Sequence, residues 1–174
     1  MELFDLLADN VALATNVPAA DDEWPLAVHR HYGRREILTA VGRWTEKTKP
    51  DAREGIVRLV DVRTELLFVT LDKSEKRFSP TTSYDDYAIS ADLFHWQTQS
   101  LISPDSDSGR RYQEQLLNGW RFLLFVRPTV DEAYTYLGPV SYVSHTGSRP
   151  MNITWRMAAP IPGIFLTQYA RLIA

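Results

Sequence analysis

The chain has no cysteine among its 174 residues, which excludes a disulfide framework and a zinc site built on thiolates. It has no apolar run approaching the roughly 18 residues that a membrane-spanning helix requires. Its first six residues are acidic and apolar and lack the basic start of a signal peptide. We therefore expect a cytoplasmic protein. No motif indicates a cofactor or a metal.

The sequence also lacks an excess of basic over acidic residues. The sequence has 19 Lys and Arg against 22 Asp and Glu, for a net charge of −3. This argues against a protein that coats nucleic acid without specificity, because such proteins carry a broad basic surface. A glycine-rich phosphate loop and a Gly-x-Ser-x-Gly element are both missing. We expect a recognition protein and not an enzyme.

The composition that is present is globular, with 44% hydrophobic and 24% charged residues, and the length fits one domain of ordinary size. Two prolines and three adjacent acids fall within residues 16–25. They predict a boundary between a short N-terminal helix with its linker, residues 1–24, and a main domain, residues 25–174.

Hydrophobic patterning predicts strands and helices that do not alternate regularly. The predicted strands cover residues 25–32, 55–61, 64–71, 94–99, 121–127, 133–137, 140–144 and 153–157, and the predicted helices cover residues 34–41, 107–117 and 164–172. Turns are expected at Gly138-Pro139 and at residues 147–150. The apolar run 121–127 predicts a central strand. This set of predicted strands and helices favours an α+β fold, with a strongly bent mixed sheet or a partly closed small barrel flanked by helices.

Residues 78–99 form the most informative segment, because it concentrates aromatic rings, carboxylates, amides and hydroxyls. A planar ligand with a hydrogen-bonding edge needs this mixture of flat faces and polar groups. For each ring taken singly, packing in the core is an equally reasonable interpretation. Asp85 and Asp86 could equally cap a turn or a helix.

Several motifs resemble one family. They include residues 68–82, Tyr84, residues 86–90 and 93–97, Gln99, Ser108-Gly109 with Arg111-Tyr112, residues 123–127, 136–139 and 142–145, Gly147, and residues 149–151 and 153–155. The family is the uncharacterised C-terminal domain found behind phospholipase-D-like nuclease and DEAD/DEAH helicase modules in bacterial restriction-type proteins. The resemblance covers residues 28–162. No helicase or nuclease motif is present, so neither activity is carried over.

The resemblance implies a relative of the SRA (SET- and RING-associated) readers, which share the PUA-like fold. Such a domain would read 5-methylcytosine or 5-hydroxymethylcytosine in a modification-dependent (type IV) restriction system, by turning the modified base out of the duplex. The implied partners are double-stranded DNA with modified cytosine and nuclease or helicase domains.

On this interpretation the 78–99 segment supplies a base pocket. Stacking walls come from Tyr84, Tyr87 and Trp96, and the cytosine amino group donates to Asp86 or, as second choice, to Asp85. The base edge or the neighbouring strand is contacted by His95, Gln97 and Gln99. Phosphate contacts are assigned to Lys73, Lys76, Arg77, Ser79, Thr81, Thr82 and Arg149. Whether Tyr84 and Tyr87 share one side depends on the local backbone, which the sequence leaves open.

Three alternatives remain. His29 and His31, with His95 or His145, could form a zinc site. Thr70, Lys73 and Glu75 faintly resemble the catalytic set of small ASCH-type amidohydrolases that act on modified nucleosides. The chain could instead be an interaction module that docks on helicase or nuclease domains through an exposed apolar patch.

Overall fold

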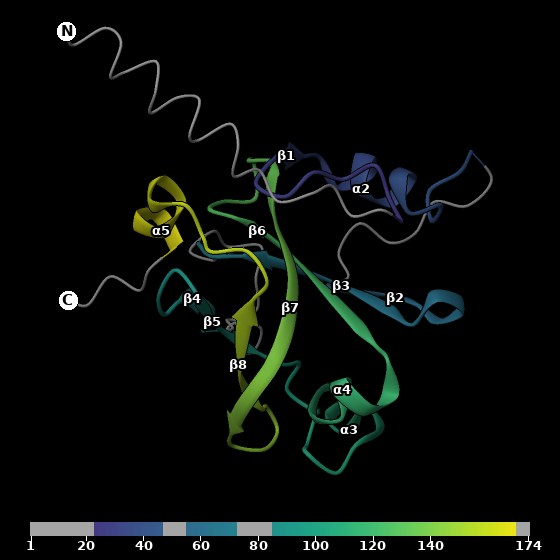
Figure 1. Ribbon diagram of the computed structural model, residues 1–174, viewed down its shortest axis with the longest axis vertical. Helices are drawn as coiled ribbons and strands as arrows, with labels where there is room; N and C mark the ends of the chain where they lie inside the picture. The colour runs from purple at the N-terminus through teal and green to yellow at the C-terminus, as the bar shows by residue number, and fades with distance from the viewer. Residues whose placement is uncertain (1–22, 47–54, 73–84, 170–174) are drawn as a thin grey trace, which may run out of the picture.

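A computed structural model of the chain describes residues 23–46, 55–72 and 85–169, and Figure 1 shows the arrangement of their helices and strands. The strands are β1 (His31–Tyr32), β2 (Ile56–Leu59), β3 (Thr64–Thr70), β4 (Tyr87–Ala88), β5 (Leu93–Gln97), β6 (Arg121–Arg127), β7 (Tyr134–Thr146) and β8 (Asn152–Met157). The helices are α2 (Arg34–Ala40), α3 (Asp107–Gln113), α4 (Gln115–Asn118) and α5 (Gly163–Tyr169), with a 3₁₀ turn, η1 (Val60–Val62). The predicted α+β class is confirmed.

All eight described strands belong to one mixed sheet in the order β2-β3-β6-β7-β8-β5-β4, with β1 paired to β7. Strands β3 and β6 run parallel, and the other pairs run antiparallel. Every residue of β3 is buried, as are the five inner residues of β6. Strand β6 lies between β3 and β7 in the sheet, and a strand covered on both faces has a nearly continuous apolar run, so the predicted central position of residues 121–127 is confirmed.

The sheet bends around its main core. One buried cluster includes Leu67 and Val69 of β3 together with Phe94 and Trp96 of β5, although three other strands separate β3 from β5 in the sheet. In Figure 1, β7 runs as one long curved ribbon through the middle of the molecule. The two ends of the strand order, β2 and β4, do not pair within the described residues. The structure therefore matches the bent-sheet alternative and is not a closed barrel.

Helix α2 packs on the other side of the sheet, against residues of β2, β3, β6 and β7. Its Ile37 and Leu38 are fully buried in a second cluster that contains Leu66, Phe68 and Phe125. The helix begins where the Glu36 carboxylate accepts a hydrogen bond of 2.5 Å from the Gly33 backbone N–H, and it ends before Gly42, whose φ is +73°. Both ends agree with the predicted helix 34–41. Strands β4, β5 and β8 contribute nothing to this second cluster.

The predicted turn at Gly138-Pro139 is wrong, because β7 is one continuous strand. Gly138 has φ of +97°, and the register between β6 and β7 shifts beside it, so the glycine produces a bulge within the strand. The Pro139 carbonyl accepts a hydrogen bond of 3.0 Å from Ala158, which lies just past the end of β8. The missing N–H of Pro139 therefore faces a place where no ladder bond is needed.

The helix predicted at 107–117 is divided at Glu114 into α3 and α4. The strand predicted at 25–32 reduces to β1, because His29 adopts a left-handed φ of 68°. The other predicted strands and the helix from 164 agree with β2, β3, β5, β8 and α5 within a few residues. Residues 1–22 lie outside the described part, so the predicted domain boundary stays a prediction. No helix among the described residues has the length and apolar character to cross a bilayer.

Candidate functional site

Strands β5 and β8, which contribute nothing to the cluster beneath α2, present a row of polar side chains. Along β5 and β8, buried residues alternate with half-exposed or exposed ones. Residues paired directly across strands lie on the same face, and the register joins His95 to Thr154 and Gln97 to Asn152. We call this surface the outer polar face. It comprises Tyr87, Leu93, His95, Gln97, Ser141, Ser144, Thr146, Asn152, Thr154 and Arg156, of which only Leu93 is aliphatic.

Two aromatic rings stack on this face. Tyr87 and His95 are direct cross-strand partners on β4 and β5, and their ring centroids lie 4.6 Å apart with planes inclined by 10°. The Nδ1 atom of His95 lies 2.6 Å from the backbone carbonyl oxygen of Asp85. Since a carbonyl can only accept, His95 Nδ1 carries the proton of this hydrogen bond. The contact holds the imidazole in one orientation.

The Gln97 side chain is held in a similar way. Its Nε2 donates to Oδ1 of Asn152 over 3.0 Å, and its Oε1 accepts from the backbone N–H of Asp85 over 3.4 Å. The amide is therefore oriented within the face. The structure brings together four of the predicted pocket residues, Asp85, Tyr87, His95 and Gln97.

The Asp86 side chain forms a hydrogen bond with the backbone of β5 beside these residues. Its Oδ1 accepts a hydrogen bond of 2.8 Å from the backbone N–H of Gln97. This oxygen takes the place that a strand carbonyl would occupy if β4 began earlier, and it satisfies a backbone donor at the sheet edge. Asp86 is the first choice to accept from the cytosine amino group, and one of its carboxylate oxygens is thus already bonded to the sheet backbone.

Trp96 requires a correction, because it lies in the core and offers no wall for stacking. The residue is 5% exposed, its ring meets Tyr112 edge-on at 5.5 Å, and it lies 6.0 Å from the ring of Trp155. Strand alternation is the reason, since Trp96 must point away from the side that carries His95 and Gln97. The core interpretation holds for this ring.

Gln99 and Arg149 lie at one end of the face. Gln99 is exposed beyond the end of β5, and Arg149, also exposed, has φ of 59° in the loop between β7 and β8. The backbone N–H of Arg149 donates to the Ile102 carbonyl over 3.0 Å, so the two loops lie side by side. Buried Thr98 joins them further, because its hydroxyl accepts from the Met151 N–H over 3.0 Å.

The remaining predicted site residues cannot be placed. Tyr84, Lys73, Lys76, Arg77, Ser79, Thr81 and Thr82 lie outside the described residues.

The motif Ser108-Gly109 with Arg111-Tyr112 contributes Arg111 to a charge cluster around the buried Glu65. This cluster was not predicted from the sequence. Arg111 and Arg58 each donate from Nε to Oε1 of Glu65 over 2.7 Å, and Glu65 is fully buried. Tyr112 packs beside them, and burial, with a smaller effect of Glu65, raises its pKa. The one available signal was a glutamate inside a strand that is otherwise uncharged and mostly apolar.

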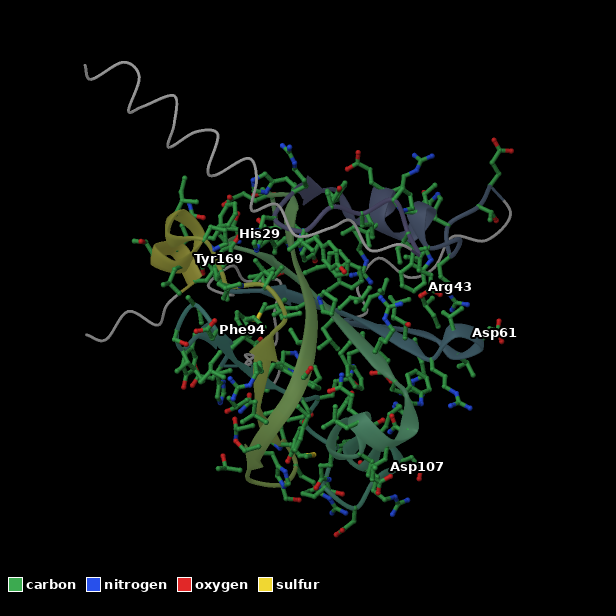
Figure 2. All side chains as sticks on the ribbon, viewed as in Figure 1. His29, Arg43, Asp61, Phe94, Asp107 and Tyr169 are labelled. Atoms are coloured by element: carbon green, nitrogen blue, oxygen red, sulfur yellow. The ribbon has the colours of Figure 1, made fainter. Side chains whose placement is uncertain are left out.

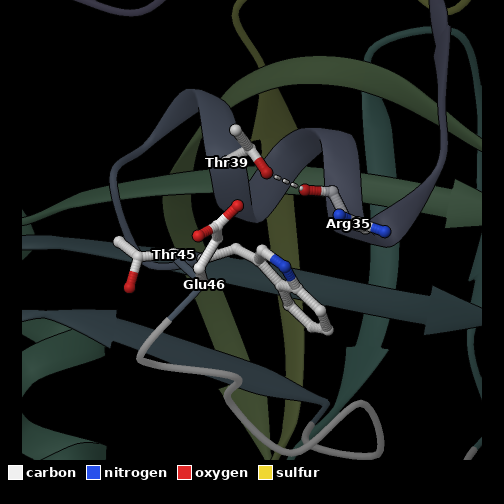
Figure 3. A pocket seen from close by; sticks show the side chains of 5 residues that line it. Arg35, Thr39, Thr45 and Glu46 are labelled. Carbon is white, nitrogen blue, oxygen red and sulfur yellow. Dashed lines mark hydrogen bonds between the residues drawn. The ribbon is translucent and has the colours of Figure 1, made fainter.

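A separate hollow of about 590 Å³ lies against α2 and is shown in Figure 3. Its walls are Arg35, Thr39, Trp44, Thr45 and Glu46. The Thr39 hydroxyl donates to the Arg35 carbonyl over 2.7 Å. None of the predicted base-pocket residues that the structure describes lines this hollow, and it shares no wall residue with the outer polar face.

The metal and hydrolase alternatives gain no support from the described residues. No group of three or more His, Asp or Glu side chains suited to a metal occurs among them. His29 lies in a turn and does not share a strand with His31, and burial lowers its pKa. Thr70 is buried and accepts from Arg127 Nε over 2.9 Å, while Lys73 and Glu75 lie outside the described part. The hydrolase hypothesis therefore stays untested.

Two comparisons with known proteins add to this geometry. The model of one protein family matches residues 26–168, and that family is described as a domain of unknown function, DUF3427. No curated protein matches the chain.

Proposed function

The chain belongs to the DUF3427 family, and from that premise we propose that it is a DNA-reading domain. It binds duplex DNA that contains 5-methylcytosine or 5-hydroxymethylcytosine and holds the modified base outside the helix. It serves in the cytoplasm as the reader module of a modification-dependent restriction system. Kinship with SRA readers and the PUA-like fold is part of this proposal, as is the extent of the reading domain over residues 25–174.

The outer polar face is the observation that supports the proposal most directly. It combines the stacked rings of Tyr87 and His95 with the oriented amides of Gln97 and Asn152. Turning a base out of a duplex costs a few kcal/mol, and stacking on an aromatic side chain returns about 1–3 kcal/mol per base. Fixed amides and hydroxyls beside the rings can then distinguish one base edge from another.

The charges around this face suit a base more than a phosphate at its centre. Arg149 and Arg156 lie toward opposite ends, both exposed, and neither forms an ion pair with another described residue. The carboxylate of Asp86 adjoins the middle of the face, where its Oδ1 accepts a hydrogen bond from the Gln97 backbone N–H. We expect the two guanidinium groups to contact the backbone on either side of the extruded base.

Fluorescence anisotropy with three duplexes of one sequence tests the proposal. The central cytosine is methylated, hydroxymethylated or unmodified. We expect either modified duplex to bind at least about tenfold more tightly than the unmodified one. Equal affinity for all three removes the claim of modification reading.

A pair of variants tests whether this face carries the binding. Tyr87→Ala removes the ring that stacks on His95 and should weaken binding of the modified duplex by about 1–3 kcal/mol. Tyr87→Phe keeps the ring and should bind almost as the wild type does. If both variants bind like the wild type, the base is held elsewhere.

A second function is favoured by a different surface. Leu116 and Leu117 on α4 are 87% and 90% exposed, which is unusual for two adjacent leucines. They are candidates for docking on a nuclease or helicase domain. Co-elution of the chain with such a domain in size-exclusion chromatography, lost on Leu116→Ser with Leu117→Ser, would support this function.

A further inference from the structure

One nitrogen of the His95 imidazole forms a hydrogen bond within the protein, and the other can bind a ligand. Nδ1 donates to the Asp85 carbonyl, and the ring lies against Tyr87 at 4.6 Å. The residue is half-exposed. Within the part of the chain that the structure describes, His95 Nε2 makes no hydrogen bond and is not among the polar atoms sealed in the interior.

Fixing the proton on Nδ1 determines what Nε2 can recognise. In the neutral imidazole one nitrogen donates and the other accepts, so the Asp85 carbonyl makes Nε2 an acceptor. The stacked tyrosine restricts rotation of the ring, which keeps the acceptor in place before any ligand arrives. A ligand that meets this atom must present an N–H or O–H group.

We propose that His95 Nε2 accepts a hydrogen bond from the exocyclic amino group of the bound cytosine, and that His95 thereby sets specificity for cytosine over thymine. This deepens the proposed function and rests on it. Cytosine carries an amino donor at C4, whereas thymine carries a carbonyl acceptor there. Against thymine, two acceptors would face each other.

Asp86 competes for this role in the sequence-based interpretation, but its Oδ1 already accepts from the Gln97 backbone. His95 Nε2 has no such commitment to the sheet. Its place in the row with Tyr87 and Thr154 also puts the acceptor beside a ring on which the base can stack. The inference therefore moves the amino-group contact from a carboxylate to an imidazole.

The tautomer itself can be measured without DNA. Two-dimensional ¹⁵N–¹H NMR of the imidazole of the whole chain distinguishes a protonated Nδ1 from a protonated Nε2. We expect the neutral imidazole of His95 to carry its proton on Nδ1 and none on Nε2. A proton on Nε2 would overturn the inference whatever the DNA experiments show.

Binding to duplexes with four different bases then shows which donor meets Nε2. The candidates are the exocyclic amino group of cytosine and the hydroxyl of the hydroxymethyl group. The duplexes contain 5-methylcytosine, 5-hydroxymethylcytosine, thymine or 5-hydroxymethyluracil, each opposite an abasic site so that the cost of extrusion is nearly equal. We expect both cytosines to bind about 10- to 100-fold more tightly than thymine and 5-hydroxymethyluracil. Affinity that follows the hydroxymethyl group instead would assign the acceptor to the hydroxyl and overturn the proposal.

His95→Phe keeps an aromatic ring against Tyr87 and removes the acceptor. We expect it to abolish the preference for the cytosines while the remaining affinity for thymine stays near that of the wild type. The matched control is His145→Phe, because His145 pairs with Ile153 of the core side and its Nδ1 contacts the Tyr142 hydroxyl at 2.6 Å. The control should keep the preference.

The outcomes are distinguishable. If the wild type does not prefer modified over unmodified cytosine, the proposed function fails and this inference fails with it. If the wild type does prefer it but His95→Phe, shown to be folded by its melting transition, still separates cytosine from thymine, only the role of His95 is refuted. If His95→Phe does not fold, the NMR tautomer and the four-duplex series decide the matter.

Discussion

Consecutive residues of β5 point to opposite faces of the sheet and have different roles. In β5, His95 and Gln97 face outward beside Tyr87 and Asn152, while Trp96 between them is part of the core. The alternation of a strand makes this unavoidable. A motif that looks like one cluster of pocket residues therefore serves both recognition and packing, and a substitution at each position reports on a different property.

Trp96→Ala should destabilise the fold and not act on binding alone. Removing a buried tryptophan leaves a cavity against Tyr112 and Trp155, and such truncations cost about 3–5 kcal/mol. Urea unfolding followed by tryptophan fluorescence or circular dichroism measures this. Gln99→Ala, at an exposed position, should stay within about 0.5 kcal/mol of the wild type. A stable Trp96→Ala protein with weakened DNA binding would restore the stacking role.

The two arginines that contact Glu65 should differ in their importance. The side chain of Arg111 is 13% exposed and that of Arg58 is 43% exposed, while Glu65 is fully buried. Breaking a buried pair leaves an uncompensated charge and costs about 3–5 kcal/mol, whereas an exposed pair contributes about 0–1 kcal/mol. We expect Arg111→Ala to lower the free energy of unfolding far more than Arg58→Ala, as measured by chemical denaturation. Similar losses would mean that Arg58 shares the buried charge equally.

At the scale of elements, α3 is held by close contact as well as by charge. Its Gly109 packs on the preceding loop, where a Cβ atom would come within 2.0 Å of the Ser103 carbonyl oxygen. The Ser106 hydroxyl accepts from the Gly109 N–H over 3.1 Å and begins the helix at the same place. The glycine of the motif is thus explained by approach of the backbone and not by any ligand.

Gly109→Ala should therefore displace α3 and destabilise the protein by about 3 kcal/mol, at the upper end of the range for overpacking. The matched control is Gly163→Ala at the start of α5, where a Cβ atom would meet nothing within 4 Å. Thermal unfolding of both variants measures the difference. Equal melting temperatures would show that the loop before α3 yields easily.

Elements with a clear hydrophobic period were predictable from sequence, and the features that depend on distant partners were not. The hairpin of β2 and β3 and the central β6 follow from local apolar patterns. Glu65 and Arg111 are far apart in the chain, and nothing local indicates that they meet. Gly138-Pro139 has the composition of a turn, yet the end of β8 lets a strand continue through it. The side on which Trp96 lies could have been read from alternation alone.

At the scale of the whole molecule, the sheet is covered unequally. Figure 2 draws side chains on every described element, while the second core cluster joins α2 to β2, β3, β6 and β7 and includes no residue of β4, β5 or β8. The polar surface over β4, β5 and β8 is the part of this side on which a large ligand could rest. The unequal cover follows from the sequence, since β3 and the inner part of β6 are buried along their length, whereas buried and exposed residues alternate in β5 and β8.

Three tyrosines predict how the stability of the whole fold responds to alkali. Burial raises the pKa of Tyr112, Tyr142 and Tyr169 above the ordinary value of 10.0. The unfolded chain therefore loses these protons at lower pH than the folded chain does. The free energy of unfolding should be unaffected by these groups below about pH 10 and should fall as the pH rises further.

Urea unfolding between about pH 8 and about pH 11 checks this expectation. Tyr169→Phe removes the hydroxyl that donates to Thr135 over 2.8 Å and should flatten part of the decline. Stability that stays constant through this range would show that the three phenols ionise equally easily in both states.

The strand order has a consequence for biosynthesis. Strand β5 finds its long antiparallel partner in β8, which the ribosome makes only after β6 and β7. Until residue 157 has left the exit tunnel, Phe94 and Trp96 of the nascent chain have no Ile153 or Trp155 to pack against. Productive collapse of this domain must wait for its last strand, and the apolar side of β5 is a natural target for a chaperone on the ribosome.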